Sequence, residues 1–417
     1  MFVYLDNSAT TKQYESVTEK MIESMRGDYG NPSSLHNMGL SAEKLVKEAR
    51  NHVAKAVGFS REEVYFTSGG TESANLALFG VADAMKRRGN KIITTRVEHA
   101  AVLESCKKLE SNGFEVVYAS VDEKCRLNLD ELFSHIDDKT ILISVMNVNN
   151  EVGTIMPLGE IARAKGGSEV ASRDKESRAK GGSEVTSRGD ESRAKGDWIL
   201  HTDAVQALGK TPFCGGDADI VTASAHKIHG PKGCGAVAVR KGVKVSPMIF
   251  GGGQEKNMRS GTENVAGISG FGEAVRVMSE NFGDRVAYIA KLRNYLLSGI
   301  KAEIQDIKLN SVEEASLNGE AGFCSPAILN ISFLGTRGEV ILHGLESEKI
   351  YVSTGAACSS NKKGKNSTLA SMGLSDKEIE GSLRFSFCEF NTIEEMDFVL
   401  LKLKEQVNKF RKLGSYR

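Results

Sequence analysis

The alternation of strands and helices is the feature that most limits how this chain can fold. Between residues 63 and 230, short apolar runs rich in Val, Ile and Thr alternate with segments whose apolar residues recur every three or four positions. Runs of the first kind are typical of buried strands, and segments of the second kind are typical of amphipathic helices. Because strands separated by helices lie parallel in one sheet, the sequence predicts an α/β fold with a mainly parallel sheet flanked by helices.

One predicted strand ends in a group of reactive side chains. The β-branched run at residues 220–222 is followed by SAHK (224–227), and a Gly-Pro pair then turns the chain. Open α/β sheets bind ligands at the edge where such strands end. A lysine shielded from water at that edge is a usable amine nucleophile. A lysine on the surface would give the same local pattern, so this stretch alone leaves both interpretations open.

A second strand end favours an anion. Residues 63–67 form a predicted strand that runs through the polar turn SGGT (68–71) into a helix. Glycines let the backbone approach a ligand, and the free N–H groups of a new helix attract negative charge. Many strand–helix turns share this pattern without a ligand. Residues 209–211 imitate the end of a Walker motif, but position 204 is Ala where that motif requires Gly.

Composition limits the partners and the compartment. The 54 basic residues balance the 54 acidic residues, so no net charge draws the chain to nucleic acid or anionic lipid. No run approaches the ~18 apolar residues that a membrane helix needs. The odd number of cysteines and the lack of a C-x-x-C pair argue against a disulfide framework and against a metal site. We therefore expect a cytoplasmic protein with free thiols at residues 106, 125, 214, 234, 324, 358 and 388.

A charged repeat interrupts the alternation. Residues 164–178 recur almost unchanged as residues 179–193, and a third copy begins at Ala194. These copies have balanced charge and scarcely an apolar side chain, so they cannot bury enough surface to offset the entropy of ordering. The sequence predicts a surface insertion at about residues 164–195.

The second half of the chain has a mixed pattern of strands and helices. The polar, glycine-rich segment at residues 251–264 precedes this change. We predict a large domain over residues 14–262 and a smaller α+β domain built from residues 1–13 and 263–417.

Nine short motifs, taken together and in order, resemble the cysteine desulfurases of the NifS/IscS type. That group belongs to the class V aminotransferases among the fold-type I enzymes that use pyridoxal 5'-phosphate (PLP). The resemblance runs from residue 2 to about residue 413, apart from the insertion. The motifs are LDNSATT (5–11), GNPSS (30–34), TSGGTES (67–73), EH (98–99), VNNE (148–151), HTDAVQ (201–206), SAHK (224–227), RSGT (259–262) and STGAACSS (353–360).

The resemblance implies how PLP is held. Lys227 would bond covalently to PLP and later move the α-proton of the substrate. Asp203 would pair with the ring nitrogen, and Gln206 would donate to the phenolic oxygen of the ring. His99 would lie on the ring face and take part in proton transfer.

Further roles follow from the same resemblance. Phosphate would be bound by residues at the start of a helix and at the end of a strand, namely Gly70, Thr71, Ser224 and His226. Thr262 would reach the phosphate of a neighbouring subunit, so the implied protein is a homodimer. Arg384 would grip the substrate carboxylate, aided by Asn31 and by Asn150, which also counts among the cofactor residues. Pairing of Arg384 with some acid remains the alternative.

Cys358 points to the reaction. It lies in the segment GAACSSNKKGKN (355–366), which is small, polar and without apolar periodicity, as in a surface loop. Three nearby lysines would favour its thiolate. The resemblance then implies conversion of L-cysteine to L-alanine, with the sulfur held on Cys358 as a persulfide and passed to an acceptor protein.

Several alternatives remain at this point. The motifs also suit a selenocysteine lyase or another class V aminotransferase, and a non-catalytic scaffold would lose Lys227 and Cys358 more readily. The acceptor is either an iron–sulfur scaffold or a tRNA-thiolation enzyme. The sequence ends at Arg417 without the C-terminal tail that some members of the family use toward a scaffold, which leaves the acceptor open.

Deleting residues 166–195 should leave PLP content and turnover with cysteine close to those of the intact chain. Loop length affects closure entropy only logarithmically, so the segments on either side should still meet. Absorbance of bound PLP and an alanine assay measure both quantities. A deletion variant that folds but no longer produces alanine would show that the repeat has a role in the reaction.

Overall fold

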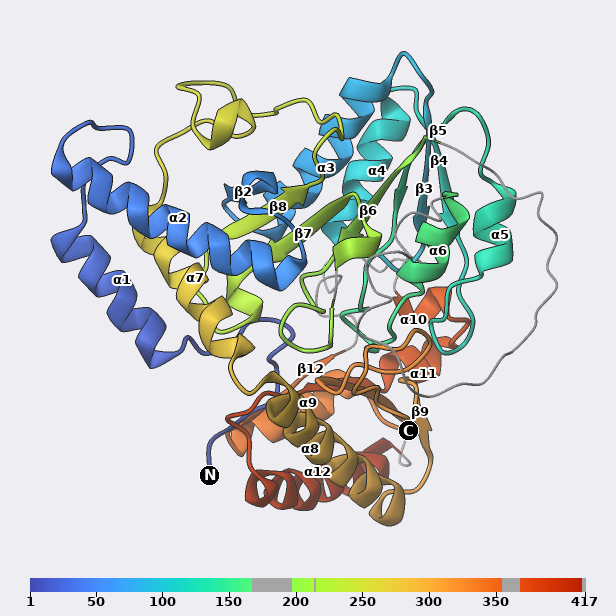
Figure 1. Cartoon of the computed structure of the whole chain (residues 1–417). Coiled ribbons are helices and arrows are strands. Elements are labelled where there is room, and N and C mark those ends of the chain that lie inside the picture. The colour runs from blue at the N-terminus through green and yellow to red at the C-terminus, as the bar shows by residue number, and fades with distance from the viewer. Residues whose placement is uncertain (167–196, 214, 355–367, 415–417) are drawn as a thin grey trace, which may run out of the picture.

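A seven-stranded sheet forms the centre of the larger part of the molecule (Figure 1). The structure, a computed structural model, describes residues 1–166, 197–213, 215–354 and 368–414. The strand order in this large sheet is β2-β8-β7-β6-β5-β3-β4. The strands are β2 (Val64–Thr67), β3 (Lys91–Thr95), β4 (Glu115–Ala119), β5 (Thr140–Ser144), β6 (Ile199–Asp203), β7 (Ile220–Ser224) and β8 (Gly235–Val239).

The large sheet is mainly parallel, as predicted. Strands β3 to β7 run parallel to one another, whereas β8 is antiparallel to both β7 and β2. Strands β3, β5, β6, β7 and β8 are buried along their whole length. Parallel strands with both faces covered consist almost wholly of apolar and β-branched residues, which is why the sequence shows continuous runs here.

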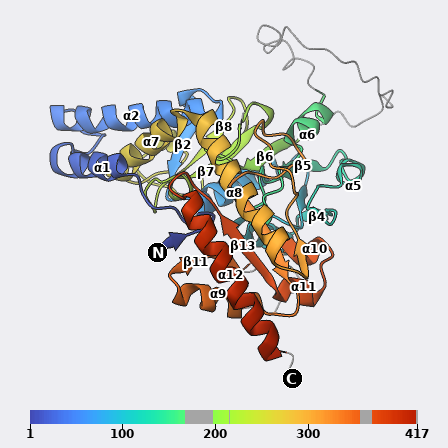
Figure 2. The same ribbon diagram turned by 90° about the horizontal axis from the view of Figure 1, so that it is seen from below.

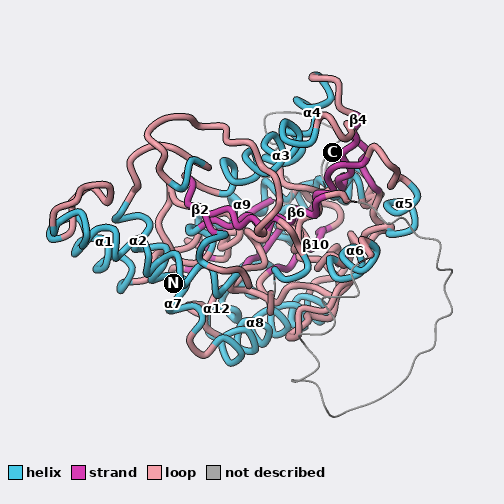
Figure 3. Tube along the Cα trace, turned by 45° about the horizontal axis from the view of Figure 1, so that its top comes forward, coloured by secondary structure: helices cyan, strands magenta, loops and turns pink. Residues whose placement is uncertain are grey.

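Alternate residues of each strand enter two hydrophobic clusters on opposite faces of the sheet. Ile92 and Ile220 pack in the cluster that contains Leu78 of α3 (Gly70–Met85), while Ile93 and Val221 belong to the other cluster. Figure 3 shows the strands in the middle with helices around them. The remaining helices of this part are α4 (Ala100–Ser111), α5 (Leu129–Ser134) and α6 (Leu158–Ala164).

Three long helices pack together on one side of the sheet. Helices α1 (Glu15–Gly27), α2 (Asn37–Val57) and α7 (Val265–Ser279) lie side by side in Figures 1 and 2. Glycines in α7 allow this close approach. A Cβ on Gly272 would lie 2.5 Å from Cα of Ala49, and one on Gly270 would lie 2.7 Å from Cγ of Met21.

A second, antiparallel sheet forms the smaller part of the molecule. Its order is β12-β13-β10-β9, and we call it the small sheet. Helices α8 and α12 cross below it (Figure 2). The elements are α8 (Phe282–Glu303), β9 (Ile307–Leu309), β10 (Ile328–Phe333), α9 (Gly338–Ser347), β12 (Ser353–Thr354), α10 (Thr368–Ser371), α11 (Asp376–Glu380), β13 (Ser382–Ser386) and α12 (Ile393–Gly414).

The N-terminal segment connects the two parts. Strand β1 (Val3–Tyr4) pairs in parallel with β11 (Ile350–Tyr351), and Asp6 forms a bridge with Ser386. The predicted domain limits stay a prediction. Residues 1–6 pair with the part that holds the small sheet, and α7, which begins after the predicted boundary at 262, packs on α1 and α2.

Within the described ranges, no helix is both long and apolar enough to cross a membrane.

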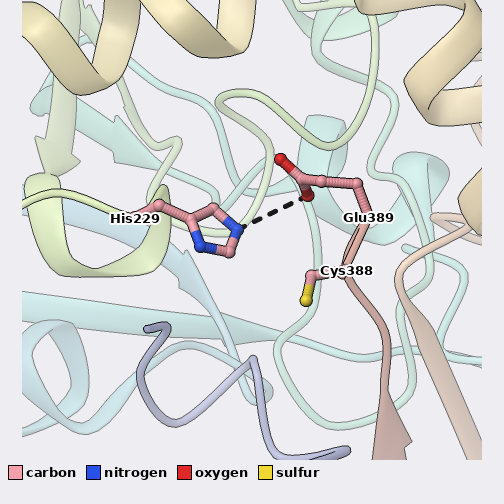
Figure 4. A group of neighbouring side chains, drawn as sticks. All are labelled: His229, Cys388 and Glu389. Carbon is pink, nitrogen blue, oxygen red and sulfur yellow. Dashed lines mark ion pairs between the residues drawn. The ribbon is translucent and has the colours of Figure 1, made fainter. Parts of the chain in front are cut away.

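A buried charged cluster joins segments that are far apart in sequence. In Figure 4 the imidazole of His229 faces the carboxylate of Glu389, with Nε2 and Oε2 3.5 Å apart, and Cys388 lies beside them. The hydroxyl of Tyr14 donates to the other carboxylate oxygen, which also lies 3.5 Å from Arg285 Nη1. The ligand atoms of His229, Cys388 and Glu389 lie within 4.8 Å of one another, as in a metal site. Because the carboxylate already pairs with a guanidinium, we interpret the cluster as an ion-pair network.

This network changes the acidity of Glu389. Burial by itself would raise the pKa of the carboxyl, but hydrogen bonds from His229 and Tyr14 and the charge of Arg285 together lower that pKa to about 2. A carboxyl with a lowered pKa stabilises the folded state above its unfolded pKa of about 4.3, and this contribution is lost as the pH falls toward 2.

Glu389→Gln should lower the free energy of unfolding by about 3 kcal/mol at pH 7, because Arg285 and His229 lose their partner in a mostly buried site. The difference from the wild type should shrink as the pH falls from about 4.3 to 2. Urea denaturation at several pH values measures both effects. Glu320→Gln, at an exposed carboxyl, is the control and should change little. Equal stability of the two variants at pH 7 would contradict the assigned network.

Candidate active site

Lys227 lies at the end of β7, in a short turn that spans Ala225–Lys227. Its amine donates to the backbone carbonyls of Ser8, at 2.6 Å, and Ala9, at 2.7 Å. The N-terminal segment is fixed at this place because both the backbone N–H and the hydroxyl of Thr11 donate to the carbonyl of His226. The lysine therefore lies at the edge of the sheet that the sequence predicted, with partners that the sequence did not reveal.

Asp203 lies at the end of the neighbouring strand. It ends β6, where it pairs in register with Thr222 of β7, and its side chain is buried. Burial raises the pKa of this carboxyl, whereas the neighbouring His99 and the positive charge of Lys227 oppose the rise. The fold thus brings His99 together with Asp203 and Lys227, from which it is separated by more than a hundred residues in sequence.

His99 begins α4 and has a defined tautomer. Its Nδ1 accepts a hydrogen bond from the backbone N–H of Ala101 at 3.1 Å, as a helix N-cap. A neutral imidazole whose Nδ1 accepts carries its proton on Nε2. His99 can therefore present an N–H to a bound molecule while its ring stays fixed on the helix.

Glu98, the residue before His99, is buried near the end of β3. Its carboxylate accepts from the hydroxyl of Thr95 at 2.8 Å and from the backbone N–H of Met146 at 2.9 Å. Burial, with a smaller contribution from the charge of Asp203, raises the pKa of Glu98 to about 8, and the hydrogen bonds from Met146 and Thr95 oppose this rise. Sequence reasoning gave Glu98 no role of its own, because a carboxylate next to a helix start is a common capping pattern.

The turn before α3 packs closely against the residues at the ends of β6 and β7 and at the start of β8. A Cβ on Gly70 would lie 3.0 Å from Cγ2 of Val205 and 3.6 Å from Cβ of Ser224. A Cβ on Gly235 would lie 2.6 Å from Cα of Gly69. As at any helix start, the first backbone N–H groups of α3 have no partner within the helix, which suits a phosphate group.

Other predicted phosphate ligands surround this turn. Ser224 is buried, and Thr71 is exposed. Nδ1 of His226 lies 3.2 Å from Oγ1 of Thr10. Burial and the charges of Lys227 and Lys210 lower the pKa of His226 to about 4. Its imidazole is therefore neutral at pH 7 and would act as a hydrogen-bond donor to an anion.

Arg384 is held in place on both sides. It lies on β13 opposite Asn330, and its side chain is buried. Nη1 donates to the backbone carbonyl of Asn150 at 2.9 Å, and Nη2 donates to Oδ1 of Asp6 at 2.8 Å. Nε is buried without a partner among the described residues. Asn150 thus orients the guanidinium through its backbone, and Asp6 is the acid partner that the sequence left as the alternative for Arg384 without identifying it.

The approach to the Cys358 segment adjoins Arg384. Ser353 of β12 pairs in register with Arg384, and the chain then enters residues 355–367. Cys358 lies outside the described residues. Glu151, which follows Asn150 in the sequence, has a buried carboxylate oxygen without a partner within the described part of the chain. Burial raises the pKa of Glu151 to about 7, opposed by the charge of Arg384 and a hydrogen bond from Thr368.

Two predicted residues lie on exposed loops. Asn31 is exposed, and its Oδ1 accepts from the backbone N–H of Ser33 at 2.9 Å. Thr262 is exposed in the loop between β8 and α7. Their predicted roles stay predictions.

Comparison with known proteins gives consistent matches over the whole chain. The model of the family described as aminotransferase class-V matches residues 3–170 and 184–399, with the interruption inside the charged repeat. A cysteine desulfurase IscS from Dictyoglomus turgidum is 38% identical over all of this chain and 97% of its own length. A solved NifS-like protein is 38% identical, with a TM-score of 0.82, over 97% of this chain and 99% of its own. A structure of SspA in complex with cysteine is 27% identical, with a TM-score of 0.72, over 94% of this chain and 100% of its own.

The chain belongs to the class V aminotransferase family, whose members depend on PLP. Within that family it is a cysteine desulfurase of the NifS/IscS type. The site fits PLP on its own chemistry, because an amine, a buried carboxylate and a helix N-terminus meet at one edge of the sheet.

Proposed function

We propose that this enzyme takes sulfur from L-cysteine and leaves L-alanine, with PLP bonded to Lys227 and with Cys358 as the acceptor of the sulfur. The observation that carries the proposal is the meeting of the Lys227 amine with the Asp203 carboxylate at adjacent strand ends. The SspA relative, solved with cysteine, supports the substrate.

The cofactor would be held by residues of the large sheet. The N–H groups at Gly70 and Thr71, with Ser224 and the neutral His226, would bind its phosphate. Asp203 would pair with its ring nitrogen, since a buried carboxylate needs a positive partner. Bound PLP withdraws electrons from the α-carbon of the amino acid attached to it.

The substrate would be oriented by Arg384. Its Nε and the remaining hydrogens of Nη1 and Nη2 can bind a carboxylate, while Asp6 and Asn150 keep the guanidinium from rotating. Lys227 would then carry the α-proton. His99 would donate a hydrogen bond from Nε2, since its Nδ1 is occupied by the helix N-terminus.

Cys358 would complete the reaction. Its thiolate attacks the sulfur of the substrate, so an S–S bond forms as the C–S bond breaks, and the carbon skeleton takes up a proton and leaves as alanine. The persulfide then passes to a thiol of an acceptor protein, either an iron–sulfur scaffold or a tRNA-thiolation enzyme. A cytoplasmic location suits this chemistry, and the cysteines in the described part of the chain are free thiols.

The active unit would be a homodimer. Two loops that carry predicted site residues also expose large apolar side chains. Tyr29 is 70% exposed and Leu35 is 96% exposed in the loop of Asn31, and Phe250 is 80% exposed in the loop of Thr262. Such side chains indicate a protein interface. A second copy as the partner would bring Thr262 to the phosphate of the opposite subunit.

Lys227→Ala and Cys358→Ala should fail at different steps. Lys227→Ala removes the amine, so no PLP should be fixed by borohydride and no alanine should form. Cys358→Ala leaves the cofactor site intact, so PLP should bind and cysteine should still change its absorption spectrum, but alanine and persulfide should not appear.

The controls for this pair lie nearby in sequence. Lys232→Ala, in the loop after Lys227, and Ser360→Ala, two residues after Cys358, should keep most of the alanine production. Near-normal alanine production by Cys358→Ala would overturn the proposal and favour a lyase that needs no cysteine nucleophile, such as a selenocysteine lyase.

Interface variants should separate dimerisation from PLP binding. Leu35→Asp combined with Phe250→Asp should shift the protein to a monomer in sedimentation, whereas Leu401→Asp, at an exposed position on α12, should not.

Thr262→Ala should keep the dimer but weaken PLP binding by about 2 kcal/mol, as expected for one hydrogen bond to a charged group. Unchanged PLP affinity in Thr262→Ala would count against its role across the interface.

A further inference from the structure

Lys210 is a buried cation to which the proposed reaction gives no role. It lies in the turn after β6, four residues beyond Gln206, and is only 7% exposed. Backbone bonds from Leu208 to Ala204 and from Thr211 to Ala207 give this turn a helical geometry. Residues four apart on such a turn lie on the same face. Burying an ammonium group is unfavourable unless its charge is used or balanced, so the position calls for a physical reason.

The ammonium of Lys210 fixes the orientation of the Gln206 amide. Nζ of Lys210 donates to Oε1 of Gln206 at 2.6 Å, and Nε2 of Gln206 donates to the carbonyl of Ser8 at 2.9 Å. When Lys210 is protonated, its ammonium group can only donate hydrogen bonds, so Oε1 faces Lys210 and Nε2 faces away from it. A flipped amide would lose both bonds.

The free end of the Gln206 amide faces Lys227. The carbonyl of Ser8 accepts from Nε2 of Gln206 and also from Nζ of Lys227, at 2.6 Å. The two nitrogen atoms therefore share one acceptor, and the second hydrogen of the amide remains for a group bonded to Lys227. Lys210, Gln206, Ser8 and Lys227 form a continuous chain of hydrogen bonds.

The charge of Lys210 interacts with the other cations of the site. Burial first, and then the charges of Lys227 and Arg384, lower the pKa of Lys210 to about 7, while Cys388 and Glu389 on the segment after β13 oppose the decrease. Lys210, Lys227 and Arg384 thus form a group of neighbouring cations. A cation that donates to an amide oxygen also polarises the N–H groups of that amide, which makes them stronger donors.

We infer that Lys210 is a positioning residue that makes Gln206 a stronger hydrogen-bond donor to the phenolic oxygen of PLP and stabilises negative charge on that oxygen. The inference rests on the proposed function, since it requires PLP on Lys227. Its consequence is spectroscopic. A nearby positive charge lowers the pKa of the bound cofactor, because protonation there adds positive charge.

The test is a titration of the absorption band of bound PLP in the dimeric holoenzyme. Lys210→Met should raise the pKa of that band by about one unit, because the charge and the hydrogen bond are both removed. Lys210→Gln can still donate a neutral hydrogen bond and should give a smaller rise. Lys232→Met, an exposed cation in the loop after Lys227, is the control and should leave the pKa of the band unchanged.

A double variant tests whether Lys210 acts through Gln206. If it does, Lys210→Met should add little to the pKa shift already caused by Gln206→Leu. Full additivity of the two shifts would overturn the inference. A Lys210→Met enzyme that is less stable to urea but titrates like the wild type would also overturn it, because the role of Lys210 would then be structural.

The outcome for the wild type separates this inference from the proposed function. If borohydride fixes no PLP to Lys227 in the wild type, the proposed function fails and the inference fails with it. If PLP is fixed normally and the titration of Lys210→Met does not differ from that of the wild type, only the inference about Lys210 fails.

Discussion

The arrangement of the active site depends on the contact between the Lys227 amine and the backbone carbonyls of Ser8 and Ala9. Lys227 belongs to the large sheet, whereas the segment that carries Ser8 is anchored beside the small sheet. Asn7 donates to the carbonyl of Ser386, and the backbone N–H of Ser8 donates to the hydroxyl of that serine. The site is therefore assembled from both parts of the molecule, which the N-terminal segment connects.

Charge is concentrated at this meeting point. The charges of Lys227 and Arg384 are near enough to lower the pKa of Lys210. Opposite charge comes from three separate segments of the chain, through the carboxylates of Asp203, Asp6 and Glu389. Cations and carboxylates removed from water are stabilised only by close partners. Asp6 holds the guanidinium of Arg384, and Glu389 pairs with Arg285 and His229, so the electrostatic arrangement also fixes the geometry that a substrate carboxylate would meet.

Local sequence patterns were sufficient to predict the alternation of strands and helices and the mainly parallel sheet. The strand at residues 220–222 and the turn SGGT (68–71) lie at the same edge of the large sheet, as the α/β pattern predicted. Strand β8 was not predicted, and its antiparallel direction between β7 and β2 leaves no mark in a sequence, because an apolar run carries no information about strand direction. The predicted Asp203, His99 and Lys227 are brought together, but Glu98, Asp6 and Lys210 were not identified as partners. Their interactions depend on burial and on distant backbone atoms.

The sequence by itself determined the class of fold, the family and the residue types that can perform the chemistry. Hydrophobic periodicity and short motifs are local properties, and both can be read along the chain. Tertiary structure decided which atoms hold those residues: the carbonyls of Ser8 and Ala9 on Lys227, the carbonyl of Asn150 on Arg384, and the ammonium of Lys210 on Gln206. The physical reason is that backbone carbonyls are the same at every position in a sequence. Only the packing of distant segments determines which of them meet a buried charge.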